Sequence, residues 1–181
     1  SFESDLAING FGDVSEALRV TTGLQHSGEP SSMLVYITPR VMDGRFEEAL
    51  KAARNMPDSL EIYRSRIQLR EEWLAQIHHL AGNAQESRAA ADAAWFRLQG
   101  LREQLGEDYR ILHAEAILSV LRDESREMIR ERVHNAIKAR PQDAVENILN
   151  DYELARVFGM AGMIEDTVTW LAPRLAAPSY M

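Results

Sequence analysis

Few residues of this chain have the types and the spacing that metal binding requires. The only adjacent histidines are His78 and His79. Neighbouring residues on one helix point about 100° apart, so the two rings cannot easily reach one metal ion. No His-Glu-x-x-His motif accompanies them. We therefore interpret both as helix-surface residues and expect no metal site.

Motifs for phosphate binding or nucleophilic catalysis are equally sparse. Gly10-Phe-Gly12 resembles half of a dinucleotide-binding fingerprint, but Ser15 stands where the third glycine is needed. The sequence holds neither a Gly-Lys-Ser or Gly-Lys-Thr loop nor a Gly-x-Ser-x-Gly elbow. The carboxylate pairs Glu47-Glu48 and Glu165-Asp166 fall at expected helix starts, where acidic residues stabilise the helix dipole. We therefore expect a non-catalytic protein that needs no cofactor.

Composition narrows the class of protein further. The chain has 181 residues, no cysteine and a net charge of −8, which excludes a disulfide scaffold and argues against nucleic-acid binding by this region. No apolar run approaches the roughly 18 residues of a membrane span, so we expect no membrane insertion. Because the chain starts at Ser1 rather than Met, we interpret it as a fragment of a longer protein. We expect it in the bacterial cytoplasm, or in the periplasm if a membrane segment lies upstream.

The elements that would have to position any site are helices. Apolar residues between 60 and 81 recur in steps of mostly three, four or seven, which predicts one long helix ending at Gly82-Asn83. Residues 33–38 could form a strand, but an unpartnered strand makes a poor sheet, so we expect a helix there too. Similar patterns predict helices at 14–24, 46–56, 84–105, 107–121, 124–140, 144–160 and 165–176. The predicted fold class is all-α.

The sequence predicts that the helices repeat as hairpins, because turn residues recur at a regular interval. The turn residues are Gly12, Gly44, Gly82, Asp123 and Gly162, and from Gly44 onward they are about 40 residues apart. An alanine lies seven residues before three of these turns, at Ala75, Ala116 and Ala155. The pattern predicts one helical-repeat domain over residues 1–181, with hairpins at about 1–28 (partial), 31–57, 58–105, 107–140 and 142–178.

Two segments carry a family resemblance. Gly-Arg-Phe-Glu-Glu-Ala-Leu at 44–50 resembles the turn and second helix of a tetratricopeptide repeat (TPR), and residues 152–162 resemble the first helix and turn of another. Residues 155–179 are similar to the last repeat of bacterial multi-domain regulators, in which a TPR region follows a winged-helix, cyclase or kinase domain. The resemblance implies antiparallel hairpins stacked into a right-handed superhelix. The interval exceeds the usual 34 or so residues, so HEAT-like geometry is the alternative.

The resemblance also implies a binding surface. In TPR proteins the first helix of each hairpin lines a concave groove that binds a peptide or a partner helix. Carried over from the three alanines, the implied groove residues are Glu72, Gln76, His79, Arg110, His113, Ile117, Tyr152 and Arg156. Equivalent positions hold Leu69, Val120 and Leu149, for which we expect packing between hairpins. The implied function is a protein–protein interaction or regulatory module of a bacterial signalling or transcription regulator.

Two other hypotheses stay open. One is a small-molecule-sensing or catalytic helical domain with a pocket near Trp73, His78, Trp95 and His113. It predicts a deep closed cavity with converging polar groups rather than an open groove. The other is a homo-oligomer formed through the terminal hairpins, with candidate residues Trp170, Leu171 and Leu175.

Overall fold

The structure is a computed structural model that describes residues 12–26, 30–62, 66–106, 108–140 and 144–176. It divides into two compact units, the first formed by residues 1–60 and 68–91 and the second by residues 61–67 and 92–181. Helix α6 (Ala84–Leu105) contributes residues 84–91 to the first unit and residues 92–105 to the second. Gly10 and the start of the partial hairpin lie outside the described residues.

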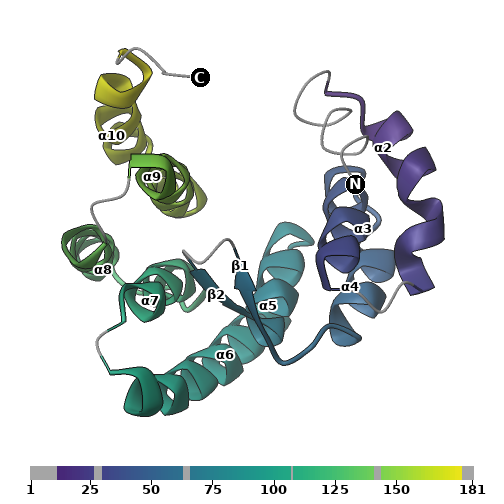
Figure 1. The fold of residues 1–181 in the computed structure, drawn as a ribbon, viewed down its shortest axis with the longest axis horizontal. Helices are drawn as coiled ribbons and strands as arrows, with labels where there is room; N and C mark the ends of the chain where they lie inside the picture. The colour runs from purple at the N-terminus through teal and green to yellow at the C-terminus, as the bar shows by residue number, and fades with distance from the viewer. Residues whose placement is uncertain (1–11, 27–29, 63–65, 107, 141–143, 177–181) are drawn as a thin grey trace. The chain divides into compact units, whose positions relative to one another are not determined.

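The first unit packs its helices around one apolar core. Its further helices are α2 (Val14–Thr21), α3 (Pro30–Met42), α4 (Phe46–Arg54) and α5 (Arg70–Leu80), with a short 3₁₀ helix, η2 (Thr22–His26), after α2 (Figure 1). The core residues are Met33, Tyr36, Ile37, Ala49, Leu50, Ala53, Met56 and Ile77. Because these residues come from α3, α4 and α5, apart from Met56 just after α4, burying them holds the three helices together.

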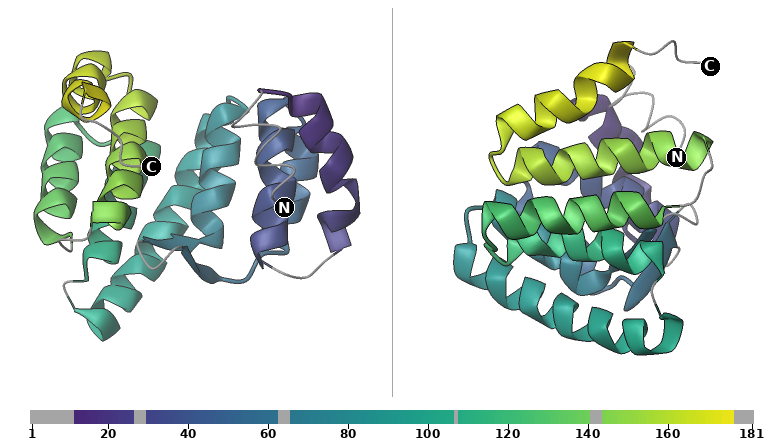
Figure 2. Two further views of the ribbon diagram at one scale, coloured as in Figure 1. Left: turned by 45° about the horizontal axis from the view of Figure 1, so that its top comes forward. Right: turned by 90° about the vertical axis from the view of Figure 1, so that its left-hand side faces the viewer.

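The second unit contains the remaining four helices of the described chain. They are α7 (Tyr109–Leu121), α8 (Arg126–Ala139), α9 (Ala144–Met160) and α10 (Ile164–Ala176). Contacts join α7 to α8, α9 to α10, and both α7 and α8 to α9, and Figure 2 shows the four as neighbours. Helix α7 is buried along almost all of its length, and α10 continues through Pro173. Among the described residues, no helix combines the length and hydropathy that a bilayer crossing requires.

One type of turn recurs four times along the described chain. At Gly44 the amide donates to the carbonyl of Val41 (3.1 Å), and the next amide, of Arg45, donates to Arg40 (2.7 Å). This pair of bonds is a Schellman motif, which needs a residue of positive φ just after the helix. The same two bonds form at Gly82, Asp123 and Gly162, and φ at the four positions is 75°, 77°, 55° and 64°. The predicted turn positions after Gly12 are therefore confirmed.

The main departure from the predicted secondary structure lies between residues 59 and 69. The sequence predicts a helix from residue 60, but the chain forms strands β1 (Ser59–Ile62) and β2 (Arg66–Leu69), paired as a two-stranded sheet. The helix begins only at Arg70, whose amide donates to the carbonyl of Asp58 (3.1 Å). Isoleucine and leucine support either element, so the period of a short apolar run did not separate them. Residues 33–38 are helical as expected, and the described chain is predominantly α-helical.

Candidate docking groove

Two of the predicted groove residues on α5 are inside the protein. Glu72 has no exposed surface, Gln76 is buried, and the Gln76 Nε2 donates to the Glu72 Oε1 at 2.8 Å. Helix α5 buries both of these polar side chains together with Ala75 and Ile77. The prediction that Glu72 and Gln76 face a partner is therefore wrong, because their polar groups are committed to the interior. Leu69 is buried, as the packing prediction expects.

Helix α7 corrects the prediction in the same way. His113 and Ile117 are both buried, because the helix is covered on nearly every side between Ile111 and Leu121. Arg110 lies near its start and is half-buried, with its Nη2 2.6 Å from the Oδ2 of Asp108. His113 and Ile117 thus belong to the core of the second unit rather than to a binding surface.

The remaining predicted groove residues lie at the surface. His79 is exposed on α5 in the first unit. Tyr152 on α9 is 68% exposed, and Arg156 pairs with Glu153 at 3.2 Å. The structure thus brings together Tyr152 and Arg156 on one helix but does not assemble the eight residues into one groove. Val120 is buried as expected, and the side chain of Leu149 lies outside the described part.

The alternative pocket does not form as a single site within one unit. Trp73 and His78 belong to the first unit, and Trp95 and His113 to the second. The guanidinium groups of Arg122 and Arg132 both lie over the Trp95 ring, 4.5 and 4.6 Å from its centroid.

Acidic side chains hold both of these arginines. Arg122 pairs with Asp92 (2.9 Å) and with Glu124 (2.8 Å). Arg132 also reaches Glu124, at 2.7 Å, so one carboxylate joins the two cations that cover Trp95. A network of ion pairs between α6, the turn after α7 and α8 thus surrounds this tryptophan.

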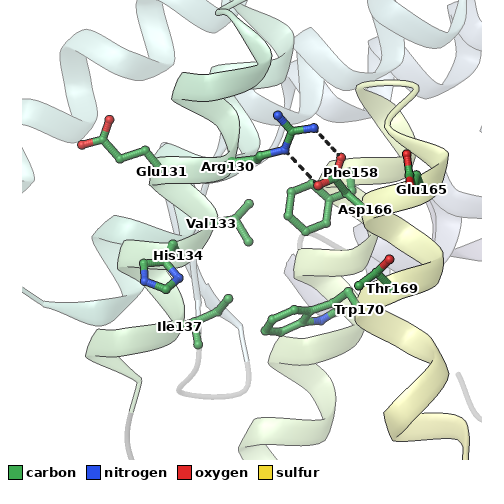
Figure 3. Close-up of a pocket in the computed structure, with 10 residues that line it drawn as sticks. All are labelled: Arg130, Glu131, Val133, His134, Ile137, Phe158, Glu165, Asp166, Thr169 and Trp170. Carbon is green, nitrogen blue, oxygen red and sulfur yellow. Dashed lines mark hydrogen bonds and ion pairs between the residues drawn. The ribbon is translucent and has the colours of Figure 1, made fainter.

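An open groove instead lies between α8 and α10, with α9 behind it, and its volume is about 630 Å³ (Figure 3). It belongs entirely to the second unit. The lining residues are Arg130, Glu131, Val133, His134, Ile137, Phe158, Glu165, Asp166, Thr169 and Trp170. None of the eight predicted groove residues is among them. The hollow exists because α8 and α10 are spaced apart. The periodicity of apolar residues predicts that each helix forms, but it does not predict the distance between two helices.

The floor of the groove is apolar. Val133 and Phe158 are buried, and Ile137 and Trp170 are half-buried with part of each side chain exposed to the hollow. The indole Nε1 of Trp170 donates to the carbonyl of Asp151 at 3.2 Å, which fixes the orientation of the ring. Trp170 was predicted at an oligomer interface. Of its predicted companions, Leu171 is half-buried and the side chain of Leu175 is outside the described part.

An ion pair between Arg130 on α8 and Asp166 on α10 crosses one end of the groove. The Nε and Nη2 of Arg130 donate to the Oδ1 and Oδ2 of Asp166, each at 2.9 Å (Figure 3). These bonds lower the pKa of the Asp166 carboxyl and raise the pKa of the Arg130 guanidinium. Both groups therefore stay ionised and neutralise each other at neutral pH.

Two further carboxylates stand on the rim, one on each wall. Glu131 on α8 and Glu165 on α10 are exposed. Neither has an ion-pair partner in the described part of the chain. With Arg130 and Asp166 paired, these two carboxylates give the rim an acidic character.

The composition of the groove indicates what kind of surface it presents. Its apolar floor and charged rim have the composition of a small protein interface. In the residues that the structure describes, no group of three or more histidine or acidic side chains could hold a metal ion.

Comparisons with models of protein families, with curated proteins and with solved structures returned no match.

Proposed function

We propose that this chain is a non-catalytic protein–protein interaction module, and that it binds a partner peptide or helix in the groove between α8 and α10. The observation that carries the proposal is the open hollow with an apolar floor and a charged rim. Apolar side chains of a partner would be removed from water against Phe158, Ile137 and Trp170, and this burial supplies most of the binding free energy. An open hollow of this kind fits a macromolecule better than a small substrate.

The proposed class is a TPR-like helical-repeat region of a bacterial regulator, in the cytoplasm. Four Schellman turns at matching places in successive hairpins support a repeat. The small residues that the resemblance rests on are all buried in the structure: Ala49, Ala75, Ala116 and Ala155. Small side chains at such places let neighbouring helices approach closely. The proposed binding surface differs from the concave groove that the resemblance implies, because four of those groove residues are buried.

The groove can be tested by filling it. Thr169 lines the hollow and is exposed, so Thr169→Trp should occupy the groove without disturbing the core. Gln104→Trp, on an exposed position of α6 in the same unit, is the matched control. Helical peptides selected from a displayed library against the 181-residue chain serve as probes. We expect Thr169→Trp to weaken their binding about tenfold or more, a loss of roughly 1.4 kcal/mol. Equal affinity in both variants would place the binding surface elsewhere.

Self-association is a second candidate, because α10 exposes apolar residues on another side. Ile164 is 66% exposed and Val168, one turn further on, is 59% exposed. Two such side chains on one face offer an apolar contact surface to a second copy. Sedimentation equilibrium of the wild type and of Val168→Glu measures this directly. A dimer that the substitution dissociates would favour this candidate, and a monomer at all concentrations would exclude it.

A further inference from the structure

We infer that the partner of the groove between α8 and α10 is a cationic amphipathic helix, whose apolar ridge lies on the floor and whose Lys or Arg side chains reach Glu131 and Glu165. This inference rests on the proposed function and adds the chemistry of the partner to it. Three properties of the hollow support it: its shape, its floor and the distribution of its charges.

The shape fits a helix. Both walls are helices and a third helix lies behind them, so the hollow is the kind of space into which a further helix packs its side-chain ridge (Figure 3). The residues that line it on α8 run from Arg130 to Ile137, which is about two helical turns, or roughly 10 Å. A partner helix of three or four turns would lie along this length and extend past both ends. Helix-in-groove recognition of this kind uses apolar anchors spaced by three or four residues.

The apolar floor favours a partner helix that carries apolar side chains as anchors. Val133 and Phe158 form its deepest part, and Ile137 and Trp170 border it at the end away from the Arg130–Asp166 pair. A Leu, Phe or Met side chain placed between Trp170 and Ile137 would be removed from water on both sides. Because the Trp170 indole is already fixed by its bond to Asp151, little side-chain entropy is lost when the anchor binds.

The charged side chains of the groove determine which residues should flank the apolar face of the partner helix. Three carboxylates and one guanidinium line the groove, and the guanidinium is paired with Asp166. Glu131 on α8 and Glu165 on α10 remain and are exposed, so each can attract a cation at one edge of the groove. In Figure 3 the Glu131 side chain points away from α10, so a long Lys or Arg side chain would reach it across the α8 wall. An acidic helix would be repelled by both. A second copy of this chain, with a net charge of −8, is also disfavoured on an acidic rim.

The test is a selection in which the flanks of the probe are free to vary. The probes are displayed 14-residue amphipathic helices, about four turns long, with one fixed apolar face and flanking positions randomised among Lys, Glu, Gln and Ser. The baits are the wild-type chain, the double variant Glu131→Lys with Glu165→Lys, and Thr169→Trp. Glu103→Lys with Glu86→Lys is the matched charge control, since both glutamates are exposed on α6 and neither lines the groove.

We expect the wild-type chain and the charge control to select helices with Lys at the randomised flanking positions. The groove double variant should instead select helices with Glu at these positions. The best Lys-flanked helix should bind the groove double variant about tenfold or more weakly than the wild type. Groove-dependent helices with neutral or acidic flanks would overturn the inference and leave the proposed function standing. Helices that bind Thr169→Trp as well as the wild type would overturn both. A dimer of the chain that Thr169→Trp dissociates would identify a second copy as the occupant and would also overturn the inference.

Discussion

Arg130 on α8 and Asp166 on α10 are joined by two parallel hydrogen bonds, each 2.9 Å long, across the end of the groove. The two residues lie in successive helical hairpins, so the pair links one hairpin to the next. A two-pronged guanidinium–carboxylate contact fixes orientation as well as distance. It therefore links the two groove walls at this end.

The pair makes a prediction about the titration of Asp166. Its pKa lies below the usual 3.8, first because of the hydrogen bonds from Arg130 and then because of the charge of that side chain. A pKa depressed in the folded state adds stability above the unfolded-state pKa, and this contribution is lost as the pH falls through the folded pKa. Arg130→Gln should raise the Asp166 pKa and reduce the loss of stability below about pH 4.

Carbon-13 NMR of the carboxyl groups measures the titration directly. Glu16 is the internal control, because its pKa is lowered by Arg19 in the first unit and should be unchanged in Arg130→Gln. An Asp166 pKa that stays the same in the variant would show that the pair does not form in solution.

Comparison of the four Schellman turns predicts that a substitution at one of them would increase the stability of the fold. Asp123 has φ of 55°, a left-handed conformation that costs an L-residue free energy and costs glycine nearly none. Asp123→Gly should therefore raise the free energy of unfolding by up to about 1 kcal/mol, while Gly82→Ala should lower it by about 1 kcal/mol. Thermal unfolding followed by circular dichroism reports both changes. A lower melting temperature for Asp123→Gly would mean that the aspartate side chain stabilises the turn.

A buried arginine stabilises the first unit. Arg40 is 4% exposed and donates to the Thr21 hydroxyl (3.1 Å) and to the Tyr36 carbonyl (2.8 Å), and it stacks 3.3 Å from the Tyr36 ring centroid. Arg40→Met removes these bonds and should destabilise the unit by about 1–3 kcal/mol. Glu48→Gln changes only the half-exposed partner of Arg40 and should cost less than about 1 kcal/mol.

Hydrogen exchange of the α3 and α4 amides gives the free energy of opening for this unit alone. Faster exchange in Arg40→Met than in Glu48→Gln is the expected order. Similar exchange in the two variants would contradict the role assigned to the buried guanidinium.

The second unit contains a buried carboxylate whose loss should be costly. Glu115 is 3% exposed and lies 2.8 Å from Arg102 and 3.5 Å from Arg132. Glu115→Ala leaves these arginines without that partner and should lower the free energy of unfolding by about 1–3 kcal/mol. The exposed control Glu103→Ala should change it by less than about 0.5 kcal/mol. Urea unfolding followed by circular dichroism compares them, and equal midpoints would refute the prediction.

Turn chemistry was the part of the fold that the sequence predicted best. Glycine at 44, 82 and 162 falls between apolar helical patterns and readily adopts a left-handed conformation, and regular spacing identified Asp123 as a fourth turn. The β1–β2 hairpin was missed because its apolar residues fit a helical period as well as a strand. The polar residues of α5 and α7 were placed at the surface, whereas tertiary packing covers both helices on several sides.

The groove itself could not be predicted, for a related reason. Val133, Ile137 and Phe158 look like ordinary core residues in the sequence, and the sequence assigns Trp170 to an oligomer contact rather than to a groove. Ile137 and Trp170 are only half-buried because α8 and α10 stand apart. That separation depends on how each helix packs on α9 and on the Arg130–Asp166 pair. It is a property of the assembled unit rather than of any one segment.

The three tryptophans of the chain allow a direct test of where a partner binds. Trp73 lies on α5, Trp95 on α6 and Trp170 on α10 in the groove, so each indole N–H gives one NMR signal that reports on a different place. Titration with a selected Lys-flanked helix should move the Trp170 indole signal and leave those of Trp73 and Trp95 in place. A bound helix that leaves the Trp170 signal unmoved, and shifts the Tyr152 and Arg156 amides of α9 instead, would contradict the account.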